Sequence, residues 1–178
     1  RYVNFKNQFP KTYLLISLFI IHMLPTTIVF AQLFVGIRFI ELMPNLNIFI
    51  ILGAIMIMGA TIIQYVADSQ MQNFKQLNKG KKACIDEGLW RYSRHPNYFG
   101  ELMVWWGVYV MYLGAAKEIN FLILAPLAMT ALFYFASIPL METKILKTRP
   151  DYKKYQDTVS KILFFPRKEE KQPEPLSN

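Results

Sequence analysis

Long apolar stretches separated by short polar segments dominate the chain. A helix needs roughly 20 mostly apolar residues to cross about 30 Å of hydrocarbon. Four stretches approach that length, at about residues 13–34, 48–66, 96–113 and 121–140. The third reaches it only if the helix begins near Pro96 and carries Asn97 and Glu101 with it. The pattern therefore predicts an all-α fold, a multi-pass transmembrane helical bundle with about four spans.

The composition agrees with a membrane environment. Hydrophobic residues make up 53% of the 178 residues, aromatic residues 15% and charged residues only 18%. A soluble globular domain usually carries about 25% charged residues, and a disordered chain is poor in hydrophobic ones. Neither class fits, so we expect the lipid bilayer to surround much of the protein.

The positive charge is distributed over alternate polar segments. Lys and Arg precede the first apolar stretch, lie between the second and third, and follow the fourth, whereas the other two loops hold only Arg38 and Lys117. Positive residues collect on the cytoplasmic side of membrane proteins. We therefore expect both ends and the segment between the second and third stretches to be cytoplasmic. This topology accounts for the net charge of +8, and no nucleic-acid partner is expected.

Composition also suggests three parts. We expect two N-terminal transmembrane helices in residues 1–66, a cofactor-binding transmembrane domain in 67–166, and a disordered polar tail in 167–178. The chain begins with Arg1 and its first residues read like a junction between helices, so we expect further helices before it. Two His and one Cys lie too far apart for a zinc site, and no metal is expected.

The densest chemistry lies where the chain re-enters the apolar region, in a run of polar and ionisable side chains: Arg91, Arg94, His95, Asn97, Tyr98 and Glu101. Polar groups at that depth are costly unless they have partners, so they usually line a cavity. Pro96 suits the first turn of a helix, whose N-terminal partial charge favours an anion. Asn97 and Glu101, four residues apart, share one helix face. Alternatively, these residues only anchor the helix at the membrane interface.

Two neighbouring regions add candidate contacts. Asp68 and Lys75 lie seven residues apart on an expected continuation of the second helix, so an acid and a base share nearly one face. Downstream, Glu142 follows Pro139 near the end of the fourth stretch. After Pro150, which interrupts a helix, we expect a short amphipathic helix on the membrane surface.

The run GLWRYSRHPNYFGELMVWWG at 88–107, with ADSQMQNFK upstream and TRPDYKKY downstream, resembles the DUF1295 proteins. These are relatives of the C-terminal domain of steroid 5-alpha-reductases. The resemblance covers roughly residues 67–166 and is most specific over RHPNYFGE at 94–101. Related patterns occur in delta-14 and delta-7 sterol reductases. A looser form occurs in isoprenylcysteine carboxyl methyltransferases.

The resemblance to the reductases implies an NADPH site. It places the nicotinamide end near Asn97 and Glu101, and the phosphates or ribose near the basic residues before them. Tyr152 matches a tyrosine of the element that closes over the cofactor. The implied cofactor-binding residues are Asp68, Lys75, Arg91, Arg94, His95, Asn97, Glu101 and Tyr152.

Three functions follow as hypotheses. The first is an NADPH-dependent reductase of a carbon–carbon double bond in a lipophilic substrate that is steroid-like, isoprenoid or another lipid. NADPH would enter from the cytoplasmic face, and Glu101 or Tyr98 would donate the proton. The second is an S-adenosylmethionine-dependent membrane methyltransferase, because part of the motif is shared with that branch. The third is a non-enzymatic membrane protein that keeps the fold.

Overall fold

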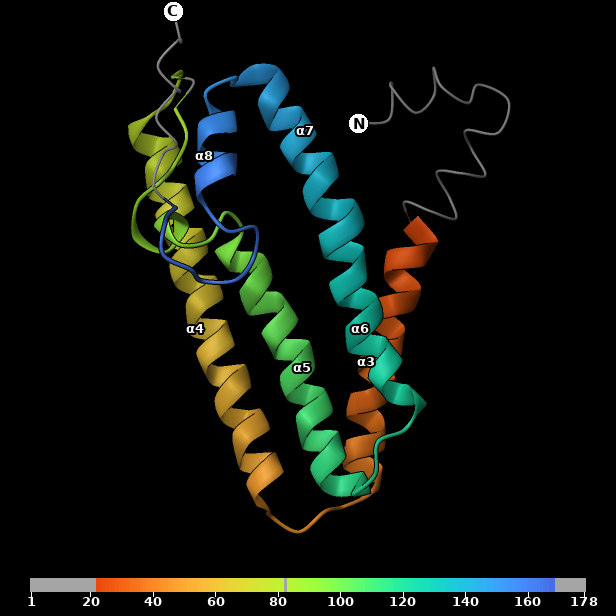
Figure 1. Cartoon of the computed structure of the whole chain (residues 1–178). Helices are drawn as coiled ribbons and strands as arrows, with labels where there is room; N and C mark the ends of the chain where they lie inside the picture. The colour runs from red at the N-terminus through yellow and green to blue at the C-terminus, as the bar shows by residue number, and fades with distance from the viewer. Residues whose placement is uncertain (1–21, 82, 169–178) are drawn as a thin grey trace, which may run out of the picture. The chain divides into compact units, whose positions relative to one another are not determined.

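The computed structural model describes residues 22–81 and 83–168, and helices make up most of these ranges (Figure 1). No strand occurs within them, which confirms the all-α prediction. The elements are, in chain order, α3 (Leu24–Glu41), α4 (Ile48–Leu77), the 3-10 turn η2 (Gly88–Arg91), α5 (Pro96–Ala116), the 3-10 turn η3 (Phe121–Ile123), α6 (Leu124–Ala131), the π-helix η4 (Leu132–Ser137), α7 (Ile138–Thr148) and α8 (Tyr152–Thr158).

Three helical stretches of the described chain are long and apolar enough to cross a membrane: Leu24–Glu41, Ile48–Leu77 and Phe121–Thr148. They are consistent with an integral membrane protein. α5 begins at Pro96, as expected, and its 21 residues give it spanning length. It is not among the three candidates, so the expected count of four spans is not confirmed. Polar residues in its first turns, Asn97 and Glu101, lower the hydropathy of α5.

The ends of the outer spans differ from the prediction. Of the span expected at 13–34, residues 13–21 lie outside the described residues, and the helix continues past Phe34 to Glu41. Arg38, expected in a loop, therefore lies on α3, where its Nη1 is 2.5 Å from Glu41 Oε2. Charges three residues apart on a helix can pair, so a helix can outlast its apolar stretch.

The last span is also longer than expected, because it continues beyond Leu140 to Thr148. It contains the π-helical turn η4 immediately before Pro139. Proline lacks the N–H that would pair with the preceding turn, and such local changes in helical pitch commonly accommodate it. Pro150 lies between α7 and α8, where a break was expected.

The chain forms two compact units, each discontinuous in sequence. Unit 1 comprises Arg1–Ile55 and Trp105–Phe135, and unit 2 comprises Met56–Val104 and Ala136–Asn178. The core of unit 1 is a cluster of buried side chains: Val35, Tyr109, Tyr112, Leu122 and Ala125. Two of the connections in this unit are fixed by side-chain amides. Asn47 accepts hydrogen bonds from the N–H groups of Phe49 and Ile50 at the start of α4, and Asn120 donates to the hydroxyl of Tyr112 at 2.6 Å.

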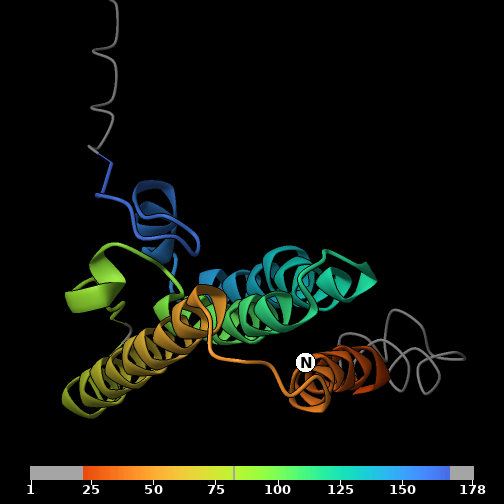
Figure 2. The ribbon, with the colours of Figure 1, turned by 90° about the horizontal axis from the view of Figure 1, so that it is seen from below.

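In unit 2, the segment between α4 and α5 folds back along the C-terminal half of α4 (Figures 1 and 2). Trp90 of η2 donates its indole N–H to the backbone carbonyl of Ala67 at 3.0 Å, and its ring packs with Ala67 and Ile85. Gln70 accepts a hydrogen bond from the N–H of Leu89 at 3.0 Å. These contacts fix the polar segment on one side of α4.

Two glycines permit this packing. Gly88 has a φ of +58°, which favours glycine, and a Cβ there would lie 2.4 Å from the Gln70 amide, which would have to shift. A Cβ at Gly100 would lie 2.8 Å from the carbonyl oxygen of Ala60. Gly100 therefore lets α5 approach α4 closely, as small residues do between membrane helices.

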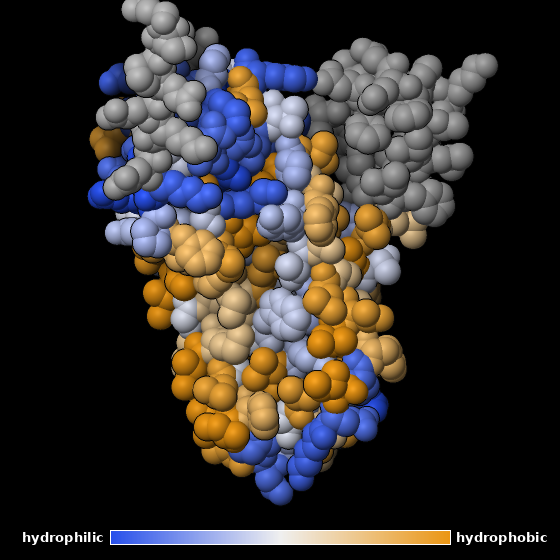
Figure 3. Space-filling model, viewed as in Figure 1, coloured by the Kyte–Doolittle hydropathy of each residue, from blue (hydrophilic) through white to orange (hydrophobic). Residues whose placement is uncertain are grey.

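The C-terminal segment of unit 2 pairs with the residues that precede α5. The N–H of Arg94 donates to the carbonyl of Ser160 at 2.8 Å, and the hydroxyl of Ser93 donates to the carbonyl of Ile162 at 2.7 Å. Hydrophilic side chains gather over this region, whereas the visible sides of the helices are largely apolar (Figure 3). Of the expected tail at 167–178, residues 169–178 lie outside the described residues, and Lys168 N–H bonds to Thr158.

Candidate functional site

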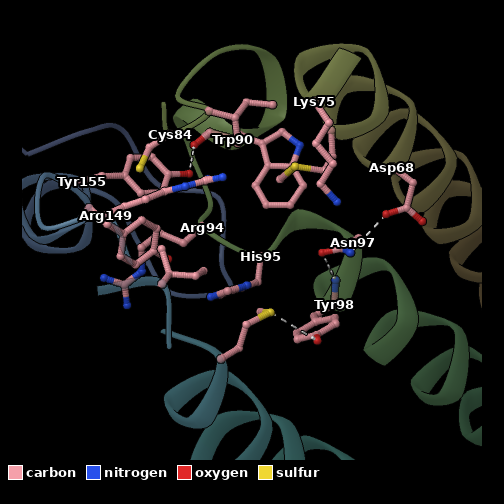
Figure 4. A pocket seen from close by; sticks show the side chains of 15 residues that line it. Asp68, Lys75, Cys84, Trp90, Arg94, His95, Asn97, Tyr98, Arg149 and Tyr155 are labelled. Carbon is pink, nitrogen blue, oxygen red and sulfur yellow. Dashed lines mark hydrogen bonds between the residues drawn. The ribbon is translucent and has the colours of Figure 1, made fainter. Parts of the chain in front are cut away.

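A pocket in unit 2 collects most of the residues that the sequence singled out (Figure 4). Its volume is about 220 Å³. Its walls come from α4, the connecting segment, the first turn of α5, α7 and α8. Seven of the nine predicted site residues line it: Asp68, Lys75, Arg94, His95, Asn97, Tyr98 and Tyr152.

The start of α5 is joined to α4 at one wall of the pocket. Asn97 donates from Nδ2 to Asp68 Oδ1 at 3.1 Å, and its Oδ1 accepts from the N–H of Tyr98 at 3.0 Å. The amide thus satisfies one orphan N–H of the helix and holds the carboxylate in place. The Tyr98 ring stacks on His95, with ring centroids 5.5 Å apart.

A buried carboxylate, Glu142 of α7, organises the opposite wall. Its Oε1 lies 2.9 Å from His95 Nε2 and accepts from the Tyr152 hydroxyl at 3.1 Å, while Oε2 accepts from Gln156 Nε2 at 2.7 Å. Arg94 Nε lies 3.0 Å from Oε1. Glu142 is only 4% exposed, so its charge is balanced inside the protein by Arg94 and these donors.

The same network sets the protonation of its members outside the membrane-spanning segments. Burial lowers the pKa of His95 and outweighs the Glu142 carboxylate, which acts in the opposite direction. The imidazole is therefore neutral near pH 7, and Nε2, which faces the carboxylate, carries its proton. Burial, with the charge of Glu142, also raises the pKa of the Tyr152 phenol, so this hydroxyl remains a donor.

Arg94 lines the pocket and is also engaged by this network. Its side chain is 7% exposed, and its Nη1 donates to the backbone carbonyl of Gln156. The family resemblance implies a contact between Arg94 and the phosphates or ribose of a cofactor, and this role stays a prediction. In the structure the contacts of Arg94 join the residues before α5 to α7 and α8.

Two other cations line the pocket from different sides. Lys75 extends from the last turn of α4, and Arg149 follows α7 (Figure 4). Among the described residues, neither forms an ion pair with an acid. Arg149 interacts with the thiol of Cys84, whose pKa is raised because burial outweighs the guanidinium. Lys75 and Arg149 are therefore the cations best placed for an anionic ligand.

Arg91 and Glu101, the other two predicted site residues, do not line this pocket. Arg91 is exposed on η2. Glu101 is half-buried on α5, one turn beyond Asn97, and interacts electrostatically with Asp68. The pocket and network residues outside the predicted set include Cys84, Trp90, Glu142 and Arg149. Of these residues, Glu142 lies three positions after Pro139 and Arg149 lies directly before Pro150. These positions near prolines were the sequence feature that could have pointed to them.

A second, open hollow of about 470 Å³ adjoins the pocket and shares Cys84 and Tyr155 with it. Its other lining residues are charged: Asp86, Asp151, Lys154 and Arg167. Arg167 donates to Asp86 at 3.3 Å. An elongated ligand could therefore extend from the pocket over this hollow.

Comparison with known proteins identifies the family. The model of DUF1295, a family of proteins of unknown function, matches residues 1–159. A segment of 81 residues is 37% identical to the uncharacterized protein C594.04c of Schizosaccharomyces pombe; it covers 45% of this chain and 23% of that protein. No solved structure matches the chain. Because the family match extends over all but the last part of the sequence, the chain belongs to the DUF1295 family.

Proposed function

We propose that the pocket of unit 2 binds NADPH and that the protein reduces a carbon–carbon double bond of a lipophilic substrate. The observation that carries the proposal is the pair of cations, Lys75 and Arg149, on different sides of a pocket whose third wall is the Asp68–Asn97 pair. Two cations that form no ion pair with an acid in the described part of the chain suit the several phosphates of a dinucleotide. S-adenosylmethionine, with one carboxylate and its own positive charge, uses them less well.

The dimensions support an extended cofactor that is only partly enclosed. The pocket's 220 Å³ is below the range of about 300–1,000 Å³ typical of ligand sites, so it suits the nicotinamide end alone. The adjoining hollow of 470 Å³, whose charged lining residues are Asp86, Asp151, Lys154 and Arg167, offers room for the remainder.

In the proposed reaction, NADPH would supply a hydride to one alkene carbon, and the protein would supply a proton to the other. Tyr98 is the better donor of the two predicted candidates because its side chain lines the pocket, whereas that of Glu101 does not. His95, held by Glu142, supports the ring of Tyr98 by stacking. Trp90 and Met141 supply apolar walls that exclude water from the reacting carbon.

Cys84 provides a direct test of cofactor binding, because it is the single cysteine of the chain and lines both hollows. We expect NADPH to slow the labelling of Cys84 by a maleimide in the purified full-length protein. Lys75→Ala should weaken this protection about tenfold or more, since a hydrogen bond to a charged group is lost. The rate is followed by mass spectrometry of the Cys84 peptide over a titration of NADPH.

Lys79→Ala is the matched control, because Lys79 is an exposed lysine just after α4 that does not line the pocket. It should leave protection unchanged. Protection by S-adenosylmethionine with none by NADPH would transfer the assignment to the methyltransferase reading. Protection by neither molecule would contradict cofactor binding altogether.

We further propose that the pocket opens to the cytoplasm, where NADPH is available. The support is the concentration of Lys and Arg in the segment between α4 and α5 and after α7. In intact cells, a maleimide that cannot cross the membrane should therefore fail to label Cys84, and should label it after permeabilisation. Labelling of Cys84 from outside intact cells would invert the topology.

A further inference from the structure

Large side chains are exposed on unit 2 where the segment after α8 turns back beside the start of α5 (Figure 1). The N–H of Phe165 donates to the carbonyl of Tyr92 at 3.3 Å, so these two residues are neighbours. Their side chains are 55% and 45% exposed, and that of Leu163 is 52% exposed. We call Tyr92, Leu163 and Phe165 the exposed patch; it lies outside the helices.

Contacts with α5 set the depth of the exposed patch. Phe164, in the same segment, packs edge-to-face on Phe99 in the first turns of α5, with ring centroids 5.1 Å apart. The next residue, Gly100, lies against the backbone of Ala60 in α4, and α4 is a candidate membrane span. The exposed patch therefore lies near the end of the apolar part of α4, where a bilayer surface is expected.

The two chain segments that carry the exposed patch are basic. Residues 88–94 and 160–168 contain five Lys and Arg side chains and no Asp or Glu. Two of the five, Arg94 and Arg167, pair with acids elsewhere in unit 2. Arg91, which directly precedes Tyr92, is exposed and forms no ion pair within the described ranges. An exposed cation beside exposed aromatic rings is a combination typical of a membrane interface.

We propose that the exposed patch binds an anionic phospholipid, with its apolar side chains among the upper acyl carbons and Arg91 at the phosphate. Arginine suits this role because its guanidinium can donate two hydrogen bonds to one phosphate. Anionic lipids collect in the cytoplasmic leaflet, the side on which these basic segments are expected. A zwitterionic lipid is attracted less strongly, since its ammonium group opposes the attraction of its phosphate.

Lipid at the exposed patch also stabilises one wall of the pocket. Ser160 accepts from the N–H of Arg94 at 2.8 Å, and α8, just before it, carries Tyr152 and Tyr155, against which Cys84 packs. A ligand that binds the folded segment and not the opened one favours the folded form. Anionic lipid should therefore reduce local opening around Cys84.

The test uses the full-length protein in dodecyl maltoside without NADPH, photolabelled with phosphatidylglycerol that carries a diazirine on its acyl chain. Mass spectrometry should find adducts in residues 88–94 and 160–168. Unlabelled phosphatidylglycerol should compete for these adducts at least about fivefold better than phosphatidylcholine, since one basic residue near an anionic surface contributes about that factor. Arg91→Gln should abolish most of this preference, and Phe165→Ser should lower the yield of the adducts.

Lys79→Gln and Leu77→Ser are the matched controls, because both residues are exposed on unit 2 outside the exposed patch. Neither should alter the competition. Equal competition by the two lipids would overturn the proposal, as would equal effects of Lys79→Gln and Arg91→Gln. Absence of adducts from both segments would also contradict it, and a dimer disrupted by Phe165→Ser would then assign the exposed patch to a second copy of the chain.

The rate at which a maleimide labels Cys84 is a second readout. Phosphatidylglycerol should slow it up to about fivefold in the unmodified protein and much less in Arg91→Gln. Phosphatidylcholine should change it little, and an equal response to both lipids would contradict the proposal. Because no cofactor is present, the outcome is independent of the proposed function.

Discussion

Replacing Glu142 with alanine is expected to destabilise unit 2 by about 3–5 kcal/mol, the usual cost of removing one partner from a buried ion pair. Glu142 is 4% exposed, and the substitution leaves Arg94 without its acid inside the protein. It also leaves the hydroxyl of Tyr152 and the amide of Gln156 without their acceptor. Thermal unfolding of the purified protein in detergent measures the loss.

An exposed ion pair on the same unit supplies the control. Lys153 Nζ lies 2.5 Å from Asp157 Oδ1 on α8, but both side chains are more than half exposed. Asp157→Ala should change the unfolding temperature little, because surface pairs contribute roughly 0–1 kcal/mol. An equal effect of Asp157→Ala and Glu142→Ala would show that burial of the network is not what stabilises this region.

A double substitution distinguishes stability from function. Arg94→Met with Glu142→Leu removes both charges, and such apolar replacements of buried pairs are often neutral or stabilising. The double variant should therefore recover the stability that Glu142→Ala loses through the unpaired charge of Arg94, but not the part lost at Tyr152 and Gln156, which remain without their acceptor. It should still bind NADPH poorly, because the imidazole of His95 loses its acceptor and the wall of the pocket loses its fixed orientation. Recovery of both properties would mean that the network does not shape the pocket.

Local sequence pattern predicted the part of the site that depends on helix geometry. The spacing of Asp68 and Lys75 on α4, and Pro96 at the start of α5, required only the helical repeat and the known preference of proline for a first turn. The structure places Asp68, Lys75 and Asn97 on one pocket accordingly.

The role of Arg94 could not be obtained in this way. Its partners, Glu142 and Gln156, lie far along the chain, and only the packing of α7 and α8 against the start of α5 brings them together. A basic residue beside a helix N-terminus predicts an anion site from the sequence alone. The prediction is the same whether the side chain is accessible to a ligand or already paired with an acid of the protein. Burial decides between the two, and burial is a property of the folded chain.

Glu101 shows the limit of the helical repeat itself. Four residues advance a helix by about 400° and 6 Å, so Glu101 is rotated by about 40° from Asn97 and lies one turn farther along α5. Asn97 and Glu101 lie on roughly the same face of α5, but only Asn97 lines the pocket. The sequence pattern also predicted that α3 and α7 end several residues too early. A helix can continue past its apolar stretch when its polar residues find other partners.

Substituting phenylalanine for Tyr98 is expected to lower turnover about 10²–10⁴-fold, the range for loss of a general acid, with NADPH affinity nearly unchanged. Phenylalanine keeps the ring that stacks on His95 and removes only the hydroxyl, which lies 3.9 Å from the sulfur of Met141. The stacking contact and the shape of the pocket are retained. The measurement is single-turnover oxidation of NADPH with substrate present, beside the Cys84 protection assay for affinity.

Two companion variants decide what a loss at Tyr98 means. Tyr65→Phe makes the same chemical change on α4 at a side chain that is 74% exposed and outside the pocket, so turnover should be unaffected. Glu101→Gln keeps the size of the other predicted donor and removes its acidic proton. Because Glu101 does not line the pocket, its variant should turn over within about tenfold of the unmodified protein. The opposite result, with Glu101→Gln inactive and Tyr98→Phe active, would require the reacting alkene to lie deeper along α5 than the pocket, and Glu101 would then be the acid.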